Sequence, residues 1–144
     1  MLRHLLKSKI HRATMTGADL NYVGSISGDQ DLVDRAGSLE YEQVHVVNVT
    51  TGARSRPYAM SATAGSGTVA LNGGAARLGQ PGELAIILAY AYFGPEELAG
   101  FRPKLVFVDE KNRVVEEPHK GKLNTRTGPS AKNVSGKRRI LPPR

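Results

Sequence analysis

The chain has 144 residues, a mass of 15.5 kDa and a net charge of +7, which fits one domain with its own core, since domains commonly run to about 100–150 residues. Without cysteine it has no disulfide framework and no thiolate metal site, and its longest apolar run, residues 84–93, is far shorter than the ~20 residues of a membrane-spanning helix. The start of the chain lacks the apolar stretch of a secretory signal, so we expect a cytoplasmic protein with no membrane partner.

Most of the positive charge lies near the end of the chain. Residues 116–144 carry eight Lys or Arg side chains against Glu116 and Glu117, a net charge of +6, whereas residues 1–115 carry +1. The segment also contains four prolines and no aromatic residue, so it cannot bury enough apolar surface to offset the entropy lost on ordering. We predict a folded domain over residues 1–115 and a disordered basic tail over residues 116–144.

Segments rich in branched and aromatic residues and bounded by turn formers predict strands. In the first, residues 5–11, Ile10 lies on an apolar face, while Lys9 and His11 lie on a cationic face, as a period of two requires. The valine-rich residues 44–49 predict a strand buried on both faces. Further predicted strands are residues 20–23, 56–60, 68–71 and 84–92, and a hairpin of 104–108 with 113–115 around Glu110, Lys111 and Asn112.

Helical signals are short and few. Residues 31–36 have Asp29 and Asp31 as possible N-caps and Gly37 as a stop, and residues 95–99 begin with proline at a first-turn position. Residues 84–92 are also rich enough in alanine to favour a helix, which leaves that segment open between the two structures. Many short strands with brief helices predict a mainly β fold, either a closed barrel or a sandwich.

An ordered series of motifs carries a family resemblance. The segment KSKIHRATMTGADLNYVGSIS, residues 7–27, resembles the amino-terminal signature of the aspartate 1-decarboxylase family. Further matches follow in order over about 115 residues: the turn from Asn48 to Arg54, Tyr58, Gly65-Ser66, Asn72-Gly73, Ala75-Ala76, Pro81-Gly82 and Arg102-Pro103. The Gly-Ser pair alone is uninformative, because it occurs at Gly24, Gly37 and Gly65.

The resemblance implies a double-psi β-barrel with short helices, a homotetramer with active sites between subunits, and a pyruvoyl cofactor made from the chain itself. In that chemistry the Ser25 hydroxyl attacks the Gly24 carbonyl in an accessible, strained turn and converts the amide to an ester. Elimination then releases residues 1–24, and hydrolysis leaves a pyruvoyl group at residue 25, which acts as an electron sink for decarboxylation. The implied reaction turns L-aspartate into β-alanine, the pantothenate precursor.

The resemblance also carries site residues over to this chain. Ser25 and Gly24 form the cleaved bond, and Tyr58 corresponds to the family's proton donor. The implied substrate contacts are cations for the retained carboxylate, a tyrosine beside the cleavage point and a pocket lined by backbone groups: Lys9, Arg54, Tyr22, Pro57, Asn72, Gly73, Gly74 and Ala75. His11, on the face of Lys9, is a further candidate contact, and no metal ligand is among these residues.

This chain departs from the family pattern around the cleavage point. Pro57 stands where threonine is usual, whose hydroxyl is implied to hydrogen-bond the Gly24 carbonyl during cleavage, and proline offers neither a hydroxyl nor a backbone N–H. Ser55, Arg56, water or a maturation factor would then supply the missing donor. Other departures replace the usual residue in the same region: Asn21 for histidine, Thr63-Ala64 for a Glu-Arg pair, Gly74 for alanine and Arg77 for histidine.

Three functional hypotheses remain open. The first is decarboxylation of aspartate after self-cleavage, and the second is a pyruvoyl decarboxylase for a related amino acid, motivated by Pro57, Gly74 and Arg77. The third is an unprocessed, non-enzymatic barrel whose basic tail binds nucleic acid or an acidic partner. Because the tail has no aromatic residue for base stacking, we do not expect nucleic acid to be the main partner.

Overall fold

The computed structural model describes residues 1–117. Glu116 and Glu117 are exposed and follow the last strand. The remainder of the predicted basic tail, residues 118–144, lies outside the described residues, and so does the predicted contact of that tail with a partner.

Within residues 1–117 the chain is mainly β with short helices, which confirms the predicted fold class. The strands are β1 (Arg3–Thr14), β2 (Gly17–Asp19), β3 (Ser25–Asp29), β4 (His45–Asn48), β5 (Arg54–Ser55), β6 (Ala59–Ala62), β7 (Val69–Asn72), β8 (Leu84–Phe93), β9 (Lys104–Val108) and β10 (Val114–Val115). The helices are α1 (Gln30–Ala36), the 3-10 helix η1 (Gly73–Leu78) and α2 (Pro95–Leu98).

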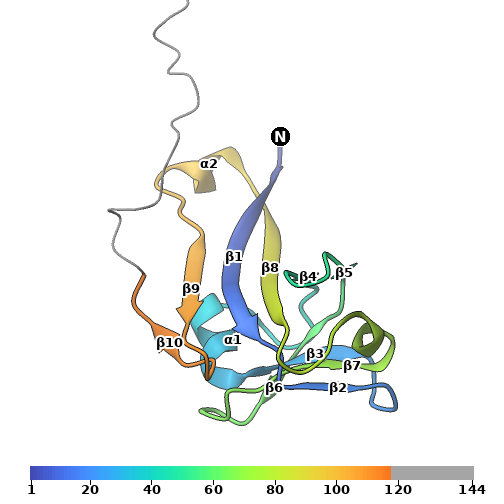
Figure 1. The fold of residues 1–144 in the computed structure, drawn as a ribbon. Coiled ribbons are helices and arrows are strands. Elements are labelled where there is room, and N and C mark those ends of the chain that lie inside the picture. Colours follow the sequence, from blue (N-terminus) through green and yellow to red (C-terminus); the bar gives the residue numbers. More distant parts are fainter. Residues whose placement is uncertain (118–144) are drawn as a thin grey trace, which may run out of the picture.

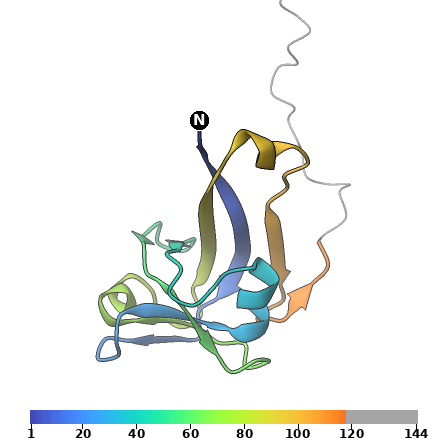
Figure 2. The same cartoon turned by 180° about the vertical axis from the view of Figure 1, so that it is seen from behind.

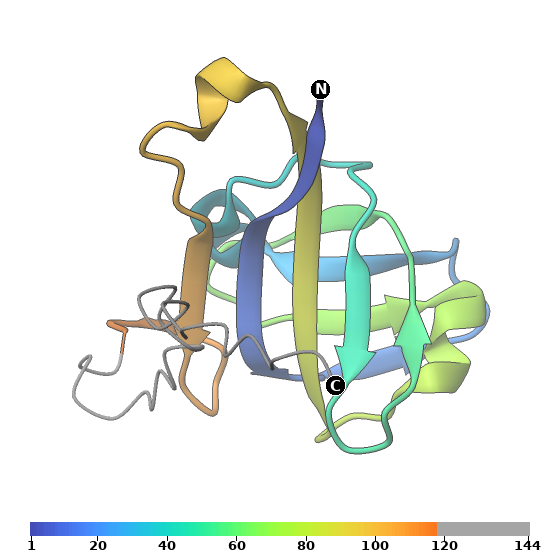
Figure 3. The same cartoon turned by 90° about the horizontal axis from the view of Figure 1, so that it is seen from above.

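The strands form two sheets that cross one another. One sheet has the order β10-β9-β1-β8-β4-β5, and the other has the order β2-β7-β3-β6. Figure 1 shows β9, β1 and β8 standing upright over β2, β3 and β7, which run across the base, and the view from above in Figure 3 shows the same crossing. Parallel pairs join segments far apart in the chain, namely β1 with β9, β2 with β7 and β3 with β6.

The hydrophobic core is made of side chains from both sheets and from α1. Its buried members include Met15, Ile26, Leu32, Val46, Leu71, Ile87 and Val106. The view from behind in Figure 2 shows α1 following β3 and lying beside β9. The core therefore anchors β3, whose first residue is Ser25.

Several predicted elements are confirmed. The first strand is longer than predicted and buries Ile10, and the segment at residues 84–93 is a strand because it pairs with β1 on one side and β4 on the other. In α1, the side chain of Asp29 caps the first turn, and Gly37 ends the helix with a left-handed φ of 65°. The final hairpin pairs β9 with β10.

The predicted strand at residues 20–23 is wrong, because this segment is a turn that joins β2 to β3. The Asp19 carboxylate accepts a hydrogen bond of 2.9 Å from the Asn21 N–H, which starts the turn. Tyr22 and Val23 are 59% and 73% exposed. Their strand propensity has no effect, because no neighbouring strand offers them backbone partners.

The strand predicted at residues 56–60 begins only at Ala59, because residues 56–58 connect β5 to β6 and Tyr58 makes only an isolated bridge to Gln43. β5 pairs with β4 in the six-stranded sheet, and β6 pairs with β3 in the four-stranded sheet. The chain passes from one sheet to the other at Arg56 and Pro57. Proline has no backbone N–H, so it cannot donate a hydrogen bond to a neighbouring strand. The Pro57 carbonyl still accepts a hydrogen bond of 2.9 Å from the Val44 N–H.

The valine-rich strand β4 is fully buried on one face only. Val46 is 2% exposed, whereas His45 and Val47 are half-buried. The other face of this sheet therefore remains partly open in the single chain. Among residues 1–117, no helix is long or apolar enough to cross a membrane.

Candidate active site

The Gly24–Ser25 bond lies where the β2–β3 turn enters the four-stranded sheet. Ser25 is the first residue of β3 and is 2% exposed, while Gly24 is exposed. The Ser25 hydroxyl accepts a hydrogen bond of 2.9 Å from Asn72 Nδ2 and donates a longer one, 3.4 Å, to the Val23 carbonyl. The predicted accessible turn is therefore accessible at Gly24 but not at the serine side chain.

Gly73 brings η1 against the Gly24–Ser25 bond. It has a φ of +62°, and a β-carbon at this position would lie 2.7 Å from Gly24 Cα and 2.9 Å from Gly24 N. Only glycine allows this approach, because it has no β-carbon and tolerates the left-handed backbone. Figure 1 shows η1 and the β2–β3 turn at the same edge of the molecule.

A cavity of about 350 Å³ opens beside this bond. Residues from three separate segments line it: Gly24, Ser25, Ser55, Arg56, Pro57, Tyr58, Asn72, Gly74, Ala75 and Leu78. Seven of the eleven predicted site residues are in this lining, and Gly73 packs against Gly24. Gly74 and Ala75 contribute no large side chain to the lining.

Tyr58 lines this cavity from the position immediately before β6. It is half-buried, and its ring lies 6.1 Å from the ring of Tyr41 between centroids. Its carbonyl accepts a hydrogen bond of 2.9 Å from the Ile26 N–H. This bond ties the backbone of Tyr58 to β3 one residue after Ser25, so the phenol and the cleavage point are held in one framework.

The predicted cations lie elsewhere. Arg54 lines a neighbouring cavity of about 300 Å³ with His45, Val47, Leu88 and Tyr90, and this cavity shares only Ser55 and Arg56 with the cavity beside Ser25. Lys9 lines neither cavity. The exposed side chain of Tyr22 is also absent from both linings, although its carbonyl lies near Gly73.

Strand register places Lys9 and Arg54 on one face of the six-stranded sheet. Lys9 is opposite Leu88, which is opposite His45, and Arg54 is opposite Val47. Residues directly opposite one another in a sheet point to the same side. His45 and Val47 are two residues apart and so also share that side. The alternate residues Ile10 and Val46 point into the core, so Lys9 and Arg54 point away from it.

His11 shares the face of Lys9, as predicted, since the two pair with Leu105 and Phe107 in β9, but it lines neither of the cavities described above. It lines a third cavity with Phe107, whose ring it meets edge-on at 5.7 Å. Burial of the ring, followed by the charges of Lys9 and Arg12, lowers the pKa of His11 from its ordinary value. The imidazole therefore favours its neutral form, and its Nδ1 atom is buried without a hydrogen-bond partner among the described residues.

Comparison with known proteins identifies the family of this chain. The model of the family described as aspartate decarboxylase matches residues 1–115. The chain belongs to the aspartate decarboxylase family. It is 57% identical over 115 residues to aspartate 1-decarboxylase 1 of Gloeobacter violaceus, covering 80% of this chain and 98% of that protein. It is 51% identical over 111 residues to aspartate 1-decarboxylase of Clostridium acetobutylicum, covering 77% and 87% of the two chains.

A third aspartate 1-decarboxylase, from Caldicellulosiruptor saccharolyticus, is 52% identical over 120 residues, covering 83% of this chain and 94% of that protein. The two-sheet arrangement with its parallel long-range pairs is consistent with the double-psi barrel of the aspartate decarboxylase family. The matched region also contains every predicted site residue.

The aspartate decarboxylase family uses a pyruvoyl group, and the residues around Ser25 fit one. Such a group would keep the carbon atoms of Ser25, which lines the cavity. The Asn72 amide already donates a hydrogen bond into this position. Gly73 keeps the neighbouring backbone close without a side chain that would fill the space.

Three cavity residues were not among the predicted substrate contacts. Ser55 and Arg56 line the cavity on either side of the change of sheets, and Leu78 closes it from the end of η1. The buried side chain of Asn48 donates a hydrogen bond of 3.0 Å to the Leu78 carbonyl. In the sequence, the only feature that points to Ser55 and Arg56 as cavity residues is that they immediately precede Pro57.

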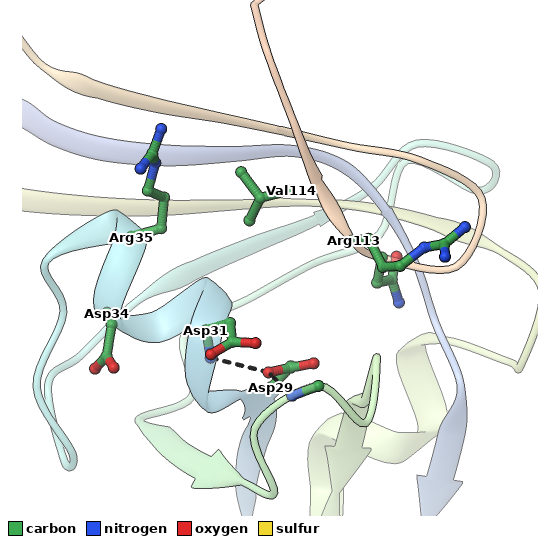
Figure 4. A pocket seen from close by; sticks show the side chains of 8 residues that line it. Asp29, Asp31, Asp34, Arg35, Arg113 and Val114 are labelled. Carbon is green, nitrogen blue, oxygen red and sulfur yellow. Dashed lines mark hydrogen bonds between the residues drawn. The ribbon is translucent and has the colours of Figure 1, made fainter.

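A separate cavity of about 500 Å³ lies at the other end of β3 and shares no lining residue with the cavity beside Ser25. Figure 4 shows Asp29, Asp31 and Asp34 around it, with Arg35 and Arg113 nearby. Among residues 1–117, no group of three His, Asp or Glu side chains is arranged to hold a metal ion.

The carboxylate of Asp29, which lines this 500 Å³ cavity, has a structural role. It accepts hydrogen bonds from the N–H groups of Asp31, Gly65 and Gly67, at 2.9, 3.0 and 2.7 Å. Burial alone would raise the pKa of Asp29, but these three donors outweigh it and lower the pKa below its usual value. Asp29 therefore joins α1 to the loop before β7.

Proposed function

We propose that this chain cleaves its own backbone between Gly24 and Ser25, and that the matured protein decarboxylates L-aspartate to β-alanine and CO2, a step that supplies pantothenate biosynthesis. One observation carries the proposal: the buried Ser25 hydroxyl accepts a hydrogen bond from Asn72, while Gly73 packs against Gly24. This arrangement occurs in a chain that matches the aspartate decarboxylase family over residues 1–115.

Self-cleavage uses groups that are already adjacent. Ser25 Oγ attacks the Gly24 carbonyl carbon, the peptide C–N bond breaks, and the hydroxyl proton passes to the Ser25 nitrogen. Elimination then breaks the Cβ–Oγ bond and one Cα–H bond of residue 25, so that residues 1–24 leave with a carboxylate. Addition of water and loss of ammonia complete a pyruvoyl group at residue 25.

The pyruvoyl group supplies a carbonyl that binds the substrate amine and withdraws electrons as CO2 leaves. The chain supplies the rest of the site. Tyr58 returns a proton to the substrate carbon from its hydroxyl, and Asn72 holds the carbonyl region by donating from Nδ2. Gly73, Gly74 and Ala75 present backbone rather than side chains, which leaves room for a small amino acid beside Pro57.

A second copy of the chain completes the site in this proposal. Aspartate needs a cation for the carboxylate that it retains, yet Lys9 and Arg54 lie on a different face from Ser25. That face also carries the half-buried residues Val47, Leu88 and Tyr90, which are suited to contact with another subunit. A homotetramer with sites between subunits would bring the cations of one copy to the cavity of another.

The donor lost at Pro57 must be replaced for cleavage to proceed. Ser55 and Arg56 line the same cavity and provide a hydroxyl and a guanidinium. Water or a separate maturation factor are the remaining sources of a donor. Loss of a single donor of this kind lowers a rate by about 10² to 10³, so we expect maturation to be slow.

Intact mass spectrometry of the denatured protein tests the proposal. We expect two masses, for residues 1–24 and 25–144, with the larger fragment carrying a carbonyl that reacts with a hydrazine. Ser25→Ala should give one mass and produce no β-alanine. Tyr58→Phe should give two masses but lower β-alanine formation by about 10² to 10⁴. A single full-length mass after long incubation would contradict the proposal.

One observation favours a second substrate class. A β-carbon at Gly74 would meet no atom within 4 Å, so the cavity is wider here than with the alanine that is usual in the family. A substituted aspartate or a glutamate could use this space. Release of CO2 from a panel of amino acids separates the two candidates, since a clear preference for unsubstituted aspartate eliminates the second.

A further inference from the structure

The Asn72 side chain contacts two serine hydroxyls on the same strand. Its Nδ2 atom donates to Ser25 Oγ at 2.9 Å and to Ser27 Oγ at 2.9 Å. Ser25 and Ser27 are two residues apart in β3, so their side chains lie on one face of the sheet. Ser27 has no role in the chemistry described so far, and it is partly buried.

Strand pairing explains how one amide reaches both hydroxyls. Asn72 is directly opposite Ser25 in the antiparallel pair of β3 and β7, and Ala70 is opposite Ser27. The methyl group of Ala70 is small, so the Asn72 amide leans along the strand towards Ser27 without a steric clash. Asn72 is 5% exposed, which leaves its amide few alternative partners.

The second hydrogen bond fixes the plane of the amide. The terminal torsion of asparagine is broad and roughly two-fold, so a single bond to Ser25 would let the NH2 group turn away. With both N–H groups paired to Ser25 and Ser27, one of them is held towards residue 25. We infer that Ser27 is a positioning residue for self-cleavage, which holds the Asn72 amide against Ser25 Oγ; this rests on the proposed function.

The held N–H assists a particular step. In elimination, the Cβ–Oγ bond of residue 25 breaks and Oγ leaves as part of the Gly24 carboxylate, so negative charge develops on the atom that Asn72 contacts. A fixed donor at a developing negative charge lowers the barrier. Once Oγ has left, the bond to Ser27 remains and keeps the Asn72 amide directed at the new carbonyl.

The test measures self-cleavage by mass, independently of decarboxylation. We expect Ser27→Ala to slow the appearance of the residue 25–144 fragment by about tenfold, the effect of one misplaced hydrogen bond. Ser27→Thr, which keeps a hydroxyl, should restore most of the rate. Ser61→Ala, on the adjacent strand β6 and outside the cavity lining, is the matched control and should cleave as the natural chain does.

Three further measurements distinguish positioning from a general loss of stability. Hydroxylamine breaks esters, so Ser27→Ala should accumulate a hydroxylamine-sensitive bond at Gly24 that the natural chain passes through quickly. Combined with Asn72→Ala, the Ser27→Ala change should slow cleavage no further, because Ser27 acts through Asn72. Thermal unfolding of each variant reports its folding separately.

Three results overturn the inference. If the natural chain cleaves and Ser27→Ala cleaves equally fast, Ser27 has no positioning role although the proposed function stands. If Ser27→Ala slows the Asn72→Ala variant by the same factor as the natural chain, Ser27 acts independently of the amide. A natural chain that never cleaves overturns the proposed function together with this inference.

Discussion

Gly73 lies so close to Gly24 that a β-carbon on Gly73 would come within 2.7 Å of the Gly24 α-carbon. The helix η1 therefore contacts the backbone at the bond proposed to be cleaved. We expect Gly73→Ala to push the Gly24 carbonyl away from Ser25 Oγ, and a displacement of this kind costs about 10²-fold in rate. The left-handed φ of +62° adds strain of about 1 kcal/mol for any other residue.

Cleavage rate by intact mass and unfolding temperature together check this prediction for Gly73. Gly74→Ala is the matched variant, because its β-carbon would meet no atom within 4 Å, and we expect its unfolding temperature to match that of the natural chain. Equal unfolding temperatures and cleavage rates for Gly73→Ala and the natural chain would show that the two glycines do not need to touch.

Restoring a hydroxyl at Pro57 should accelerate self-cleavage. Pro57→Thr places a donor in the lining of the cavity beside Gly24, and we expect a rate increase of about 10² to 10³. Pro57→Val is the control, since it removes the ring and adds no hydroxyl. Time courses of fragment formation compare the three chains. If threonine and valine behave alike, the donor comes from elsewhere, and Ser55→Ala and Arg56→Ala identify which residue supplies it.

Mixed subunits test whether Arg54 acts in another copy's cavity. Arg54→Ala should mature but lose substrate binding, and Ser25→Ala should keep its cations but never mature. The two variants are co-expressed with different tags and purified as mixed assemblies. These assemblies should recover a fraction of the natural β-alanine formation, because the Ser25→Ala subunit then supplies Arg54 to the matured cavity of the Arg54→Ala subunit. Native mass spectrometry gives the assembly size; activity that never exceeds that of the separate variants would place both residues in one subunit's site.

Asp29 should make the folded state sensitive to acid. Its folded-state pKa lies below the unfolded value of about 4, so the stability it contributes is complete above about pH 4 and is lost as the pH falls through the lowered folded pKa. We expect Asp29→Asn to reduce the free energy of unfolding by about 1–3 kcal/mol at pH 7, because backbone donors at Gly65 and Gly67 lose a carboxylate partner.

Urea unfolding at pH 7 and pH 3 measures this effect of Asp29. The difference in the free energy of unfolding between Asp29→Asn and the natural chain should shrink at pH 3, because the preference of the folded state for the ionised carboxylate contributes less stability there. Asp31→Asn is the control, since Asp31 is exposed, and it should change stability by less than about 1 kcal/mol. A difference that stays constant between the two pH values would mean that the charge of Asp29 has no part in joining α1 to the loop.

Elements specified by neighbouring residues were predictable from the sequence. The caps of α1 at Asp29 and Gly37 and the turn between β9 and β10 are local features, because their partners lie a few residues away. The motifs around Gly24 and Ser25 likewise sufficed to predict the family, which the match over residues 1–115 confirms. The alternation in the first strand separated Ile10 from Lys9 correctly, because a strand has a side-chain period of two.

Features that depend on partners far along the chain were not predictable. Tyr22 and Val23 have strand propensity but lie in a turn, since a strand requires a neighbour and none is adjacent to them. Ser27 resembles any other strand serine until the register with β7 brings Asn72 to it. The separation of Lys9 and Arg54 from Ser25 arises in the same way, because sheet pairing, not sequence distance, determines which face a side chain occupies.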